Sequence, residues 1–337
     1  MDRFDYGLPP TAIAQVPAEP RSAARLLVDG GPGRPPAHRT VADLPDLVGP
    51  GDVLVVNDTR VIPARLALRK ATGGEAEVLL LEPHPAGGWE ALVRPGRRLP
   101  PGTVLRPDAA DDGFAAVVGE DLGDGRRRVD LRLPPGLAEA DALARHGAVP
   151  LPPYLTGGLP DPERYQTVYA AHPGSVAAPT AGLHLTPEVL DRCRERGALV
   201  ATVDLSVGIG TFRPVTVDDP AEHRMHAERY RVPAATMDAC RAARRVVAVG
   251  TTTVRALEAA AATGDLEGRT DLFVRRGFPF RVVGALLTNF HLPRSSLLLL
   301  VDAFVGDRWR DLYAAALADG YRFLSFGDAM FLPARTA

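Results

Sequence analysis

The sequence contains few cysteine, lysine and aromatic residues, and each scarcity argues against a class of protein. The two cysteines, Cys193 and Cys240, are too few for a disulfide framework or a thiolate metal cluster, so we expect both to be buried apolar side chains. Lys70 is the only lysine and no Gly-Lys-Ser/Thr sequence occurs, which excludes a phosphate-binding P-loop. Aromatic residues make up 6% of the chain, too few for a surface that stacks single-stranded bases.

Long apolar runs and a strong charge of one sign are also missing. No apolar run approaches the roughly 18 residues that a membrane span needs, and the N-terminal "MDRFDYGLPP" lacks the basic and then apolar order of a secretory signal. We therefore expect a cytoplasmic protein with no membrane partner. The formal net charge of −2 gives no general attraction to nucleic acid, although a local group of arginines is enough to neutralise phosphates.

The chain is long enough for two domains, and its middle part differs from both flanks. Short strands separated by glycine and proline clusters are predicted at "EAEVLLLEP", "GWEALVR", "TVLRP", "GFAAVVGE" and "RRRVDLRL". No helical period is visible among them. Residues 66–152 are therefore predicted to form an inserted all-β, barrel-like domain.

The flanking residues 1–65 and 153–337 alternate between strand and helix patterns. Thr186 as N-cap, Pro187 at the first helical position and Gly197 as the stop predict one of the helices. Strands are predicted at "VLVV", "ALVATVDLSV", "VVAVG", "VVGALLTNF" and "YRFLSF", and further helices at "AATMDACRAARR", "ALEAAAA", "WRDLYAAALADG" and from Ser296. The expected fold class is α/β, with a mixed, largely parallel sheet, helices and the inserted β domain.

Polar clusters directly follow four of the predicted strands. They are "NDTRVIPAR" after Val56, "GIGTF" after Val207, "GTTTVR" after Val249 and "TNFHLPRSS" after Leu287, and a fifth cluster, "APTAGLH", precedes the helix at Pro187. Ligands of open α/β sheets gather at the carboxyl ends of the strands. We therefore expect these segments to form one pocket.

Three of these clusters also have a purely structural explanation, and these alternatives stay open at the level of sequence. The glycines after Val207 suit a tight turn with positive φ. The threonines after Gly250 suit either an anion at a helix N-terminus or simple capping of that helix. Asn289 and His291 either face a ligand or tie their loop together, while Ser295 or Ser296 caps the next helix.

The segment "EHRMHAERY" offers two histidines and a glutamate, but it does not predict a metal site. His223 and His226 are three residues apart, whereas a helical zinc pair is usually spaced by four and needs further ligands. We expect these groups to orient substrate or to move protons, with a solvated surface as the alternative.

Nine segments in order carry a resemblance to a known family. They are "FDYGLPPTAIAQVPAEPR" with "RLLV", "VVNDTRVIPARL", "RYQTVYA", "GSVAAPTAGLHLT", "VGIGTFRPV", "EHRMHAERY", "VGTTTVRALEAA", "LLTNFHLPRSSLLLLVDAF" and "YRFLSFGDAMFL". From Phe4 to Leu332 the chain resembles the S-adenosylmethionine:tRNA ribosyltransferase-isomerase family. The resemblance implies an α/β domain that carries a β-barrel domain, and an enzyme that needs neither a metal nor a redox cofactor.

The activity implied by the resemblance modifies the anticodon of tRNA. The ribosyl part of S-adenosylmethionine is transferred to 7-aminomethyl-7-deazaguanine at the wobble position, which gives epoxyqueuosine and releases adenine and methionine. The implied partners are S-adenosylmethionine and a tRNA anticodon stem-loop, and a monomer is expected. In the mechanism considered for the family, a base removes a proton from the 5′-carbon next to the sulfonium, so a group with a suitable pKa is needed.

The site residues expected on this basis fall into two groups. The candidates for proton transfer are His184, His226, Glu228 and His291. The candidates for binding substrate are Asn57, Asp58, Thr59, Arg60, Arg65, Thr180, Gly182, Gly208, Gly210, Thr211, Thr251, Thr252, Arg255, Asn289 and Asp328. Among these, the candidates for the methionine carboxylate or a tRNA phosphate are Asp58, Arg60, Arg65 and Arg255. Guanidinium groups bind such anions in bidentate fashion.

The chain departs from the usual family pattern at four positions. The family usually has histidine where this chain has Ser206, serine where it has Ala24, phenylalanine at Leu185 and tyrosine at Phe326. The loss of an imidazole at Ser206 is the largest change, and we expect activity to survive it. Three alternatives stay open: a paralogue that ribosylates another nucleoside or small molecule, a methyltransferase, and a non-catalytic RNA-binding protein.

Overall fold

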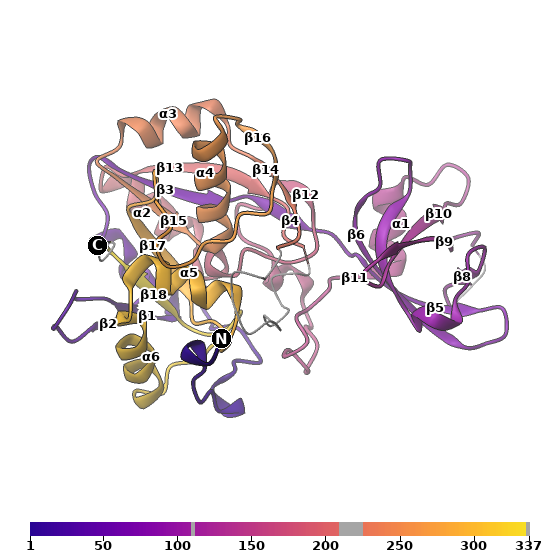
Figure 1. Cartoon of the computed structure of the whole chain (residues 1–337), viewed down its shortest axis with the longest axis horizontal. Coiled ribbons are helices and arrows are strands. Elements are labelled where there is room, and N and C mark those ends of the chain that lie inside the picture. Colours follow the sequence, from indigo (N-terminus) through magenta and orange to yellow (C-terminus); the bar gives the residue numbers. More distant parts are fainter. Residues whose placement is uncertain (109–111, 209–224, 335–337) are drawn as a thin grey trace. The chain divides into compact units, whose positions relative to one another are not determined.

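The computed structural model describes residues 1–108, 112–208 and 225–334, and it divides the chain into two compact units (Figure 1). The first unit comprises Met1–Arg60, Pro152–His172 and Ala178–Ala337, and the second comprises Val61–Leu151 and Pro173–Ala177. The second unit also contains residues 61–65 and 173–177, which lie outside the predicted insert 66–152. Residues 61–65 and 173–177 belong together because the Ile62 N–H donates to the Ser175 carbonyl at 3.0 Å.

The first unit is built on a nine-stranded mixed sheet, which confirms the α/β class. Its strands, in the order in which they lie side by side, are β16 (Glu267–Thr270), β14 (Glu228–Arg231), β13 (Leu199–Leu205), β3 (Asp52–Asn57), β15 (Arg245–Val249), β17 (Ala285–Asn289), β18 (Ala329–Leu332), β1 (Arg25–Val28) and β2 (Ala37–Thr40). The central strands β13, β3, β15 and β17 are parallel, whereas β14, β16, β18 and β2 each pair antiparallel with a neighbour. Four carboxyl ends therefore meet at one edge.

Helices flank this sheet, and two of them begin with the side-chain caps expected from the sequence. They are α2 (Pro187–Glu195), α3 (Ala234–Ala242), α4 (Thr251–Thr263), α5 (Ser296–Val305) and α6 (Arg308–Ala318), with 3-10 turns at η1 (Asp2–Phe4), η2 (Pro10–Ala12), η3 (Arg21–Ala23), η4 (Val41–Asp46), η6 (Pro162–Tyr165) and η7 (Thr180–His184). Thr186 caps α2 by accepting from the Val189 N–H, and Ser295 caps α5 by accepting from Leu298.

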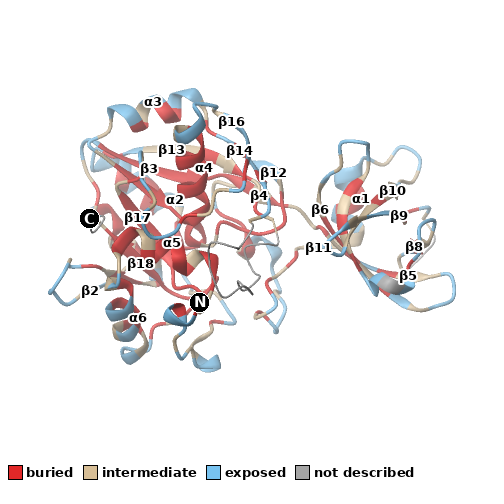
Figure 2. Cartoon of the chain, viewed as in Figure 1, coloured by how far each residue is buried: buried red, intermediate tan, exposed pale blue. Residues whose placement is uncertain are grey.

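The core of the first unit lies between the sheet and its helices. Figure 2 shows buried residues along the central strands and along α4 and α5. Leu54, Val56, Val247 and Leu287 of the parallel strands are almost fully buried, and Cys193 of α2 packs in the same cluster. Both cysteines are free and buried, as expected. No helix in the described part of the chain is long and apolar enough to cross a membrane.

Two predictions for this unit are wrong. The segment "YRFLSF" is not a strand, because Leu324 adopts a φ of 69°, which extended backbone does not allow; the closing strand is β18 instead. The helix predicted at "ALEAAAA" begins five residues too late, because α4 begins at Thr251, immediately after Gly250. The positive φ of 88° at Gly250 turns the chain from β15 directly into the helix.

The second unit is a small antiparallel barrel, as predicted. Its strands β11 (Gly147–Ala148), β5 (Arg65–Lys70), β6 (Glu75–Pro83), β7 (Trp89–Arg94), β10 (Arg126–Arg132), β9 (Ala115–Gly123) and β8 (Val104–Arg106) lie in this order, and β5 also pairs with β8. The unit further contains η5 (Gly96–Arg98) and α1 (Glu139–His146), and a separate pair of strands, β4 (Thr59–Val61) and β12 (His172–Ser175), lies where the chain passes between the units.

Five of these strands, β6 to β10, were predicted, whereas α1 was not. The helix has eight residues and buries only Ala142 and Leu143, so its sequence repeats no apolar spacing that would indicate a helix.

Candidate active site

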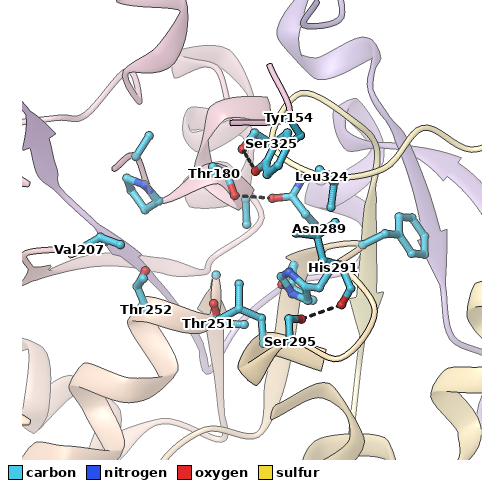
Figure 3. A pocket seen from close by; sticks show the side chains of 18 residues that line it. Tyr154, Thr180, Val207, Thr251, Thr252, Asn289, His291, Ser295, Leu324 and Ser325 are labelled. Carbon is cyan, nitrogen blue, oxygen red and sulfur yellow. Dashed lines mark hydrogen bonds between the residues drawn. The ribbon is translucent and has the colours of Figure 1, made fainter. Parts of the chain in front are cut away.

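A pocket opens at the carboxyl edge of the sheet in the first unit (Figure 3). Its lining comes from η7, the residue Val207 that follows β13, the first turn of α4, the end of β17 with the loop after it, and residues 324–325. Five of the candidate residues line it: Thr180, Thr251, Thr252, Asn289 and His291. The polar segments after β15 and β17 therefore meet there, together with η7. Gly210 and Thr211 of the "GIGTF" segment lie outside the described residues.

Asn289 is the centre of a buried hydrogen-bond network beside the pocket. Its Oδ1 accepts from the Thr180 hydroxyl at 2.9 Å, and its Nδ2 lies 2.9 Å from His184 Nε2 and 3.3 Å from the Asp328 carbonyl oxygen. The Asp328 carbonyl oxygen can only accept a hydrogen bond, so the Asn289 amide nitrogen Nδ2 is the donor in that contact. His184 Nε2 must then accept, which places the proton of a neutral imidazole on Nδ1.

His291 reaches the pocket from the loop after β17. Its Nε2 lies 2.9 Å from the Thr288 hydroxyl. Two tyrosines hold its backbone: the Tyr313 hydroxyl accepts from the His291 N–H at 2.9 Å, and the Tyr6 hydroxyl donates to the His291 carbonyl. The backbone position of residue 291 therefore does not depend on its imidazole.

Burial keeps both histidines neutral. It lowers the pKa of His291 to about 3. The pKa of His184 falls to about 4, chiefly through burial and further through the positive charges of Arg322 and Arg21. Around neutral pH each ring can accept a proton, and neither contributes a positive charge to the site.

We expect acid to destabilise the protein through these histidines. An unfolded histidine has a pKa near 6.5, so between that value and the folded values the unfolded chain binds more protons, and the free energy of unfolding rises with pH. The contribution is fully present above pH 6.5 and is lost as the pH falls towards 4 and 3. Urea unfolding at pH 6 and pH 5 measures the slope, to which each histidine contributes about 1.4 kcal/mol per pH unit.

One variant checks this prediction. His291→Asn is expected to flatten the slope by the share of one histidine. An equal slope in His291→Asn and the wild type would contradict the assignment.

Glu228 and Arg255, two further candidates, form a buried ion pair and do not line the pocket. Each side chain is only 5% exposed. Arg255 Nε also donates to the Leu272 carbonyl at 3.0 Å, and Glu228 accepts from the Gly208 N–H at 2.9 Å. Their charges are thus balanced by each other, and the pair ties α4 to β14 and to the end of β13.

The other candidates lie outside the pocket lining. Asp58 accepts from the Ala171 and His172 N–H groups through its carbonyl and faces the His172 ring, while Arg60 pairs with Glu163 at the surface. Arg65 belongs to β5 of the barrel unit and lies 3.7 Å from Glu77. His226 is exposed ahead of β14.

Several candidates hold the scaffold of the site. Asn57 bridges β3 and β13 through the Leu205 N–H and carbonyl, accepts from the Thr59 N–H, and donates to the Thr252 hydroxyl at 3.3 Å. The Asp328 carboxylate accepts from the backbone N–H groups of Arg25 and Arg322 at 2.8 Å each.

Gly182 is required for close packing in η7. A Cβ at this position would lie 2.0 Å from Tyr169 Oη and 3.0 Å from Thr167 Cγ2. We expect Gly182→Ala to reduce the free energy of unfolding by about 1–3 kcal/mol, the usual cost of overpacking. Chemical denaturation measures the change.

Tyr169 provides a control for the clash expected in Gly182→Ala. Tyr169 Oη is buried without a hydrogen-bond partner in the described chain, so Tyr169→Phe alone should cost little. The double variant Gly182→Ala/Tyr169→Phe should regain part of the lost stability. If it is no more stable than Gly182→Ala, the contact with Oη is not the cause.

Tyr154, Leu324 and Ser325 are among the lining residues that the sequence did not mark as candidates. The Tyr154 hydroxyl lies 2.8 Å from the Ser325 hydroxyl, and burial raises the pKa of Tyr154 to about 12. Leu324 lines the same wall in its left-handed conformation. Tyr154 lies in a proline-rich boundary segment and the other two in the wrongly predicted strand, so no local pattern marked them.

The chemistry available in the pocket is that of neutral groups. Among the described lining residues there are hydroxyls, one amide and one imidazole, but no Asp, Glu, Lys or Arg. In the described part of the chain, no three His, Cys, Asp or Glu side chains come together as a metal site. Such a lining suits a mostly apolar small molecule with a few fixed polar contacts.

Comparisons with known proteins agree with the resemblance seen in the sequence. Proteins named S-adenosylmethionine:tRNA ribosyltransferase-isomerase from Azoarcus sp. (strain BH72) and Thermus thermophilus are 53% and 52% identical, over 98% of this chain and 96% and 99% of theirs. A crystal structure of S-adenosylmethionine tRNA ribosyltransferase from Thermotoga maritima has a TM-score of 0.54 and 37% identity, over 97% of this chain and 99% of that one. Residues 1–332 match the family described as queuosine biosynthesis protein, and the chain belongs to that family.

Proposed function

We propose that the protein is an S-adenosylmethionine:tRNA ribosyltransferase-isomerase. It transfers and isomerises the ribosyl part of S-adenosylmethionine onto 7-aminomethyl-7-deazaguanine at the wobble position of tRNA, giving epoxyqueuosine-tRNA, adenine and methionine. The observation that carries this proposal is the pocket of hydroxyls, amide and imidazole at the sheet edge of a chain that shares about half its residues with enzymes of that name.

S-adenosylmethionine occupies this pocket in the proposal. The small, mainly apolar lining suits its ribose and the carbons bonded to its sulfonium sulfur, and the polar groups fix its orientation. Asn289 acts as a positioning residue, since it holds the Thr180 hydroxyl on one side and His184 on the other.

His291 accepts the proton from the 5′-carbon. It is the one histidine among the described lining residues, and its ring is neutral before the reaction. The low pKa of the imidazole is compatible with this role, because the transfer moves one positive charge from the sulfonium-bearing substrate to the imidazole. The total charge in the pocket stays the same, so the desolvation cost is largely that of the bound substrate.

The acceptor in the proposal is the anticodon stem-loop of tRNA. We also propose that the protein acts as a cytoplasmic monomer, without a metal or any cofactor beyond S-adenosylmethionine.

The proposal is tested by mass spectrometry of tRNA after incubation with the protein and S-adenosylmethionine. With tRNA that carries 7-aminomethyl-7-deazaguanine, we expect a ribosyl-derived mass gain on the wobble nucleoside and equal amounts of adenine and methionine. The same tRNA with guanine at that position is the control and should stay unchanged. Formation of S-adenosylhomocysteine would indicate a methyltransferase, and product on the free base alone would indicate a paralogue with another acceptor.

A further inference from the structure

We infer that the N-terminus of α4 is a carboxylate subsite, and that it holds the α-carboxylate of the methionine part of S-adenosylmethionine. The inference rests on the proposed function, because it assigns one end of the proposed substrate to one wall of the pocket. It depends on the free N–H groups of the helix, on an unpartnered threonine and on the absence of charge in the described lining.

The first turn of α4 presents free backbone donors to the pocket. Gly250 at the N-cap has no side chain that could cap the helix, and Gly250, Thr251 and Thr252 all line the pocket. The first helical N–H with an acceptor is that of Val254, which donates to the Gly250 carbonyl at 3.3 Å. The N–H groups of residues 251–253 have no acceptor in the described parts of the chain. Free N–H groups at a helix N-terminus bind anions.

The threonine side chains distinguish this helix start from an ordinary one. Thr251 is only 6% exposed, lines the pocket, and its hydroxyl has no hydrogen-bond partner among the described residues (Figure 3). The Thr252 hydroxyl accepts from Asn57 Nδ2, which leaves its own proton for a ligand. Thr253, in contrast, donates to the Val249 carbonyl at 2.7 Å and is committed to the scaffold. A buried hydroxyl and a second free proton thus lie at the same helix start as the free N–H groups.

No charged side chain in the described lining competes with the start of α4 for an anion or repels one. The described lining holds no Asp or Glu that would repel a carboxylate and no Lys or Arg that would bind it instead. Arg255, one turn further along α4, is committed to Glu228 and to the Leu272 carbonyl. The partial positive charge of the helix end is therefore the main attraction for an anion among the described groups.

This subsite sets the direction in which the substrate lies. The carboxylate binds at the start of α4, which follows β15, whereas Asn289 and His291 belong to β17 and the loop after it. The sulfonium and ribose then lie between the two walls, where the imidazole of His291 is available to the 5′-carbon.

The experiment compares two ligands, S-adenosylmethionine and its decarboxylated analogue, by isothermal titration calorimetry. The wild type should bind S-adenosylmethionine at least about 100-fold more tightly, since the carboxylate accepts several hydrogen bonds and each one to a charged group contributes roughly 10-fold. In Thr251→Val this preference should shrink by about 10-fold, because the variant loses the hydroxyl but keeps the shape. Thr251→Pro removes the N–H as well, at a helical position that accepts proline, and should reduce the preference further.

Thr253→Val is the matched control, because its hydroxyl faces the Val249 carbonyl and not the pocket. It should keep the full preference for the carboxylate. Equal affinity of the wild type for both ligands, or an unchanged preference in Thr251→Val, overturns the subsite. If the wild type binds neither ligand, the proposed function fails instead, so the two failures are distinguishable.

Discussion

Replacing His291 by asparagine is expected to lower kcat by about 10²- to 10⁴-fold, the usual contribution of a general base, with little change in the affinity for S-adenosylmethionine. The structure makes this substitution informative, because Tyr6 and Tyr313 hold the backbone of residue 291 independently of its side chain. Asparagine stays polar but cannot accept a proton near neutral pH. The variant therefore removes the chemistry of the imidazole and keeps the loop.

The rate of adenine release under single-turnover conditions measures the effect, and calorimetry measures the affinity. Thr288→Val is the companion variant. It removes the hydroxyl that lies 2.9 Å from His291 Nε2, so it should lower the rate less, because the ring loses orientation but not basicity. A rate within about 3-fold of the wild type in His291→Asn would assign proton removal to another group.

The largest expected effect on stability is at Arg255. Arg255→Met should reduce the free energy of unfolding by about 3–5 kcal/mol, because it leaves the carboxylate of Glu228 buried without its partner. The variant should also lose the hydrogen bond from Arg255 Nε to the Leu272 carbonyl, and the start of α4 should become less stable. Folding stability is normally only about 5–15 kcal/mol, so this variant should unfold at a much lower urea concentration.

Two further variants test whether the loss of stability comes from the unpaired buried charge or from the removal of any arginine. The double variant Arg255→Met/Glu228→Gln should recover a large part of the lost stability, because no unpaired charge stays buried. Arg241→Met removes an arginine that pairs with Asp238 at the surface of α3, where both side chains are about two-thirds exposed, and should cost less than about 1 kcal/mol. If Arg255→Met is as stable as Arg241→Met, the pair does not hold α4 in place.

Much of the fold was visible in the sequence because its signals are local. The strands β3, β15 and β17 are short apolar runs that end in polar residues, and Thr186 and Ser295 cap their helices in the structure. The parallel order of those strands then brings Thr251 and Asn289 to one pocket, as the strand-end argument predicted.

The parts that could not be predicted depend on partners far apart in the sequence. Glu228 and Arg255 both looked like candidates for chemistry, but nothing local shows that they neutralise each other across 27 positions. Arg60 and Arg65 come from one continuous polar segment, yet they belong to different units, because the chain passes from the first unit to the second at residue 61. The left-handed backbone of Leu324 could not be predicted either, because a leucine in this apolar segment is typical of a strand.

The hydrogen bond between the Tyr6 hydroxyl and the His291 carbonyl has a consequence for the order of folding. Its two partners are 285 positions apart, and β1 near the start of the chain pairs with β18 near its end. During synthesis the barrel, whose strands all lie between residues 65 and 148, can form while the sheet still lacks its last strands. The loop that carries His291 acquires its final shape only when Tyr313 and β18 have left the ribosome, so slow long-range pairing, and not the barrel, should limit the rate at which active protein appears.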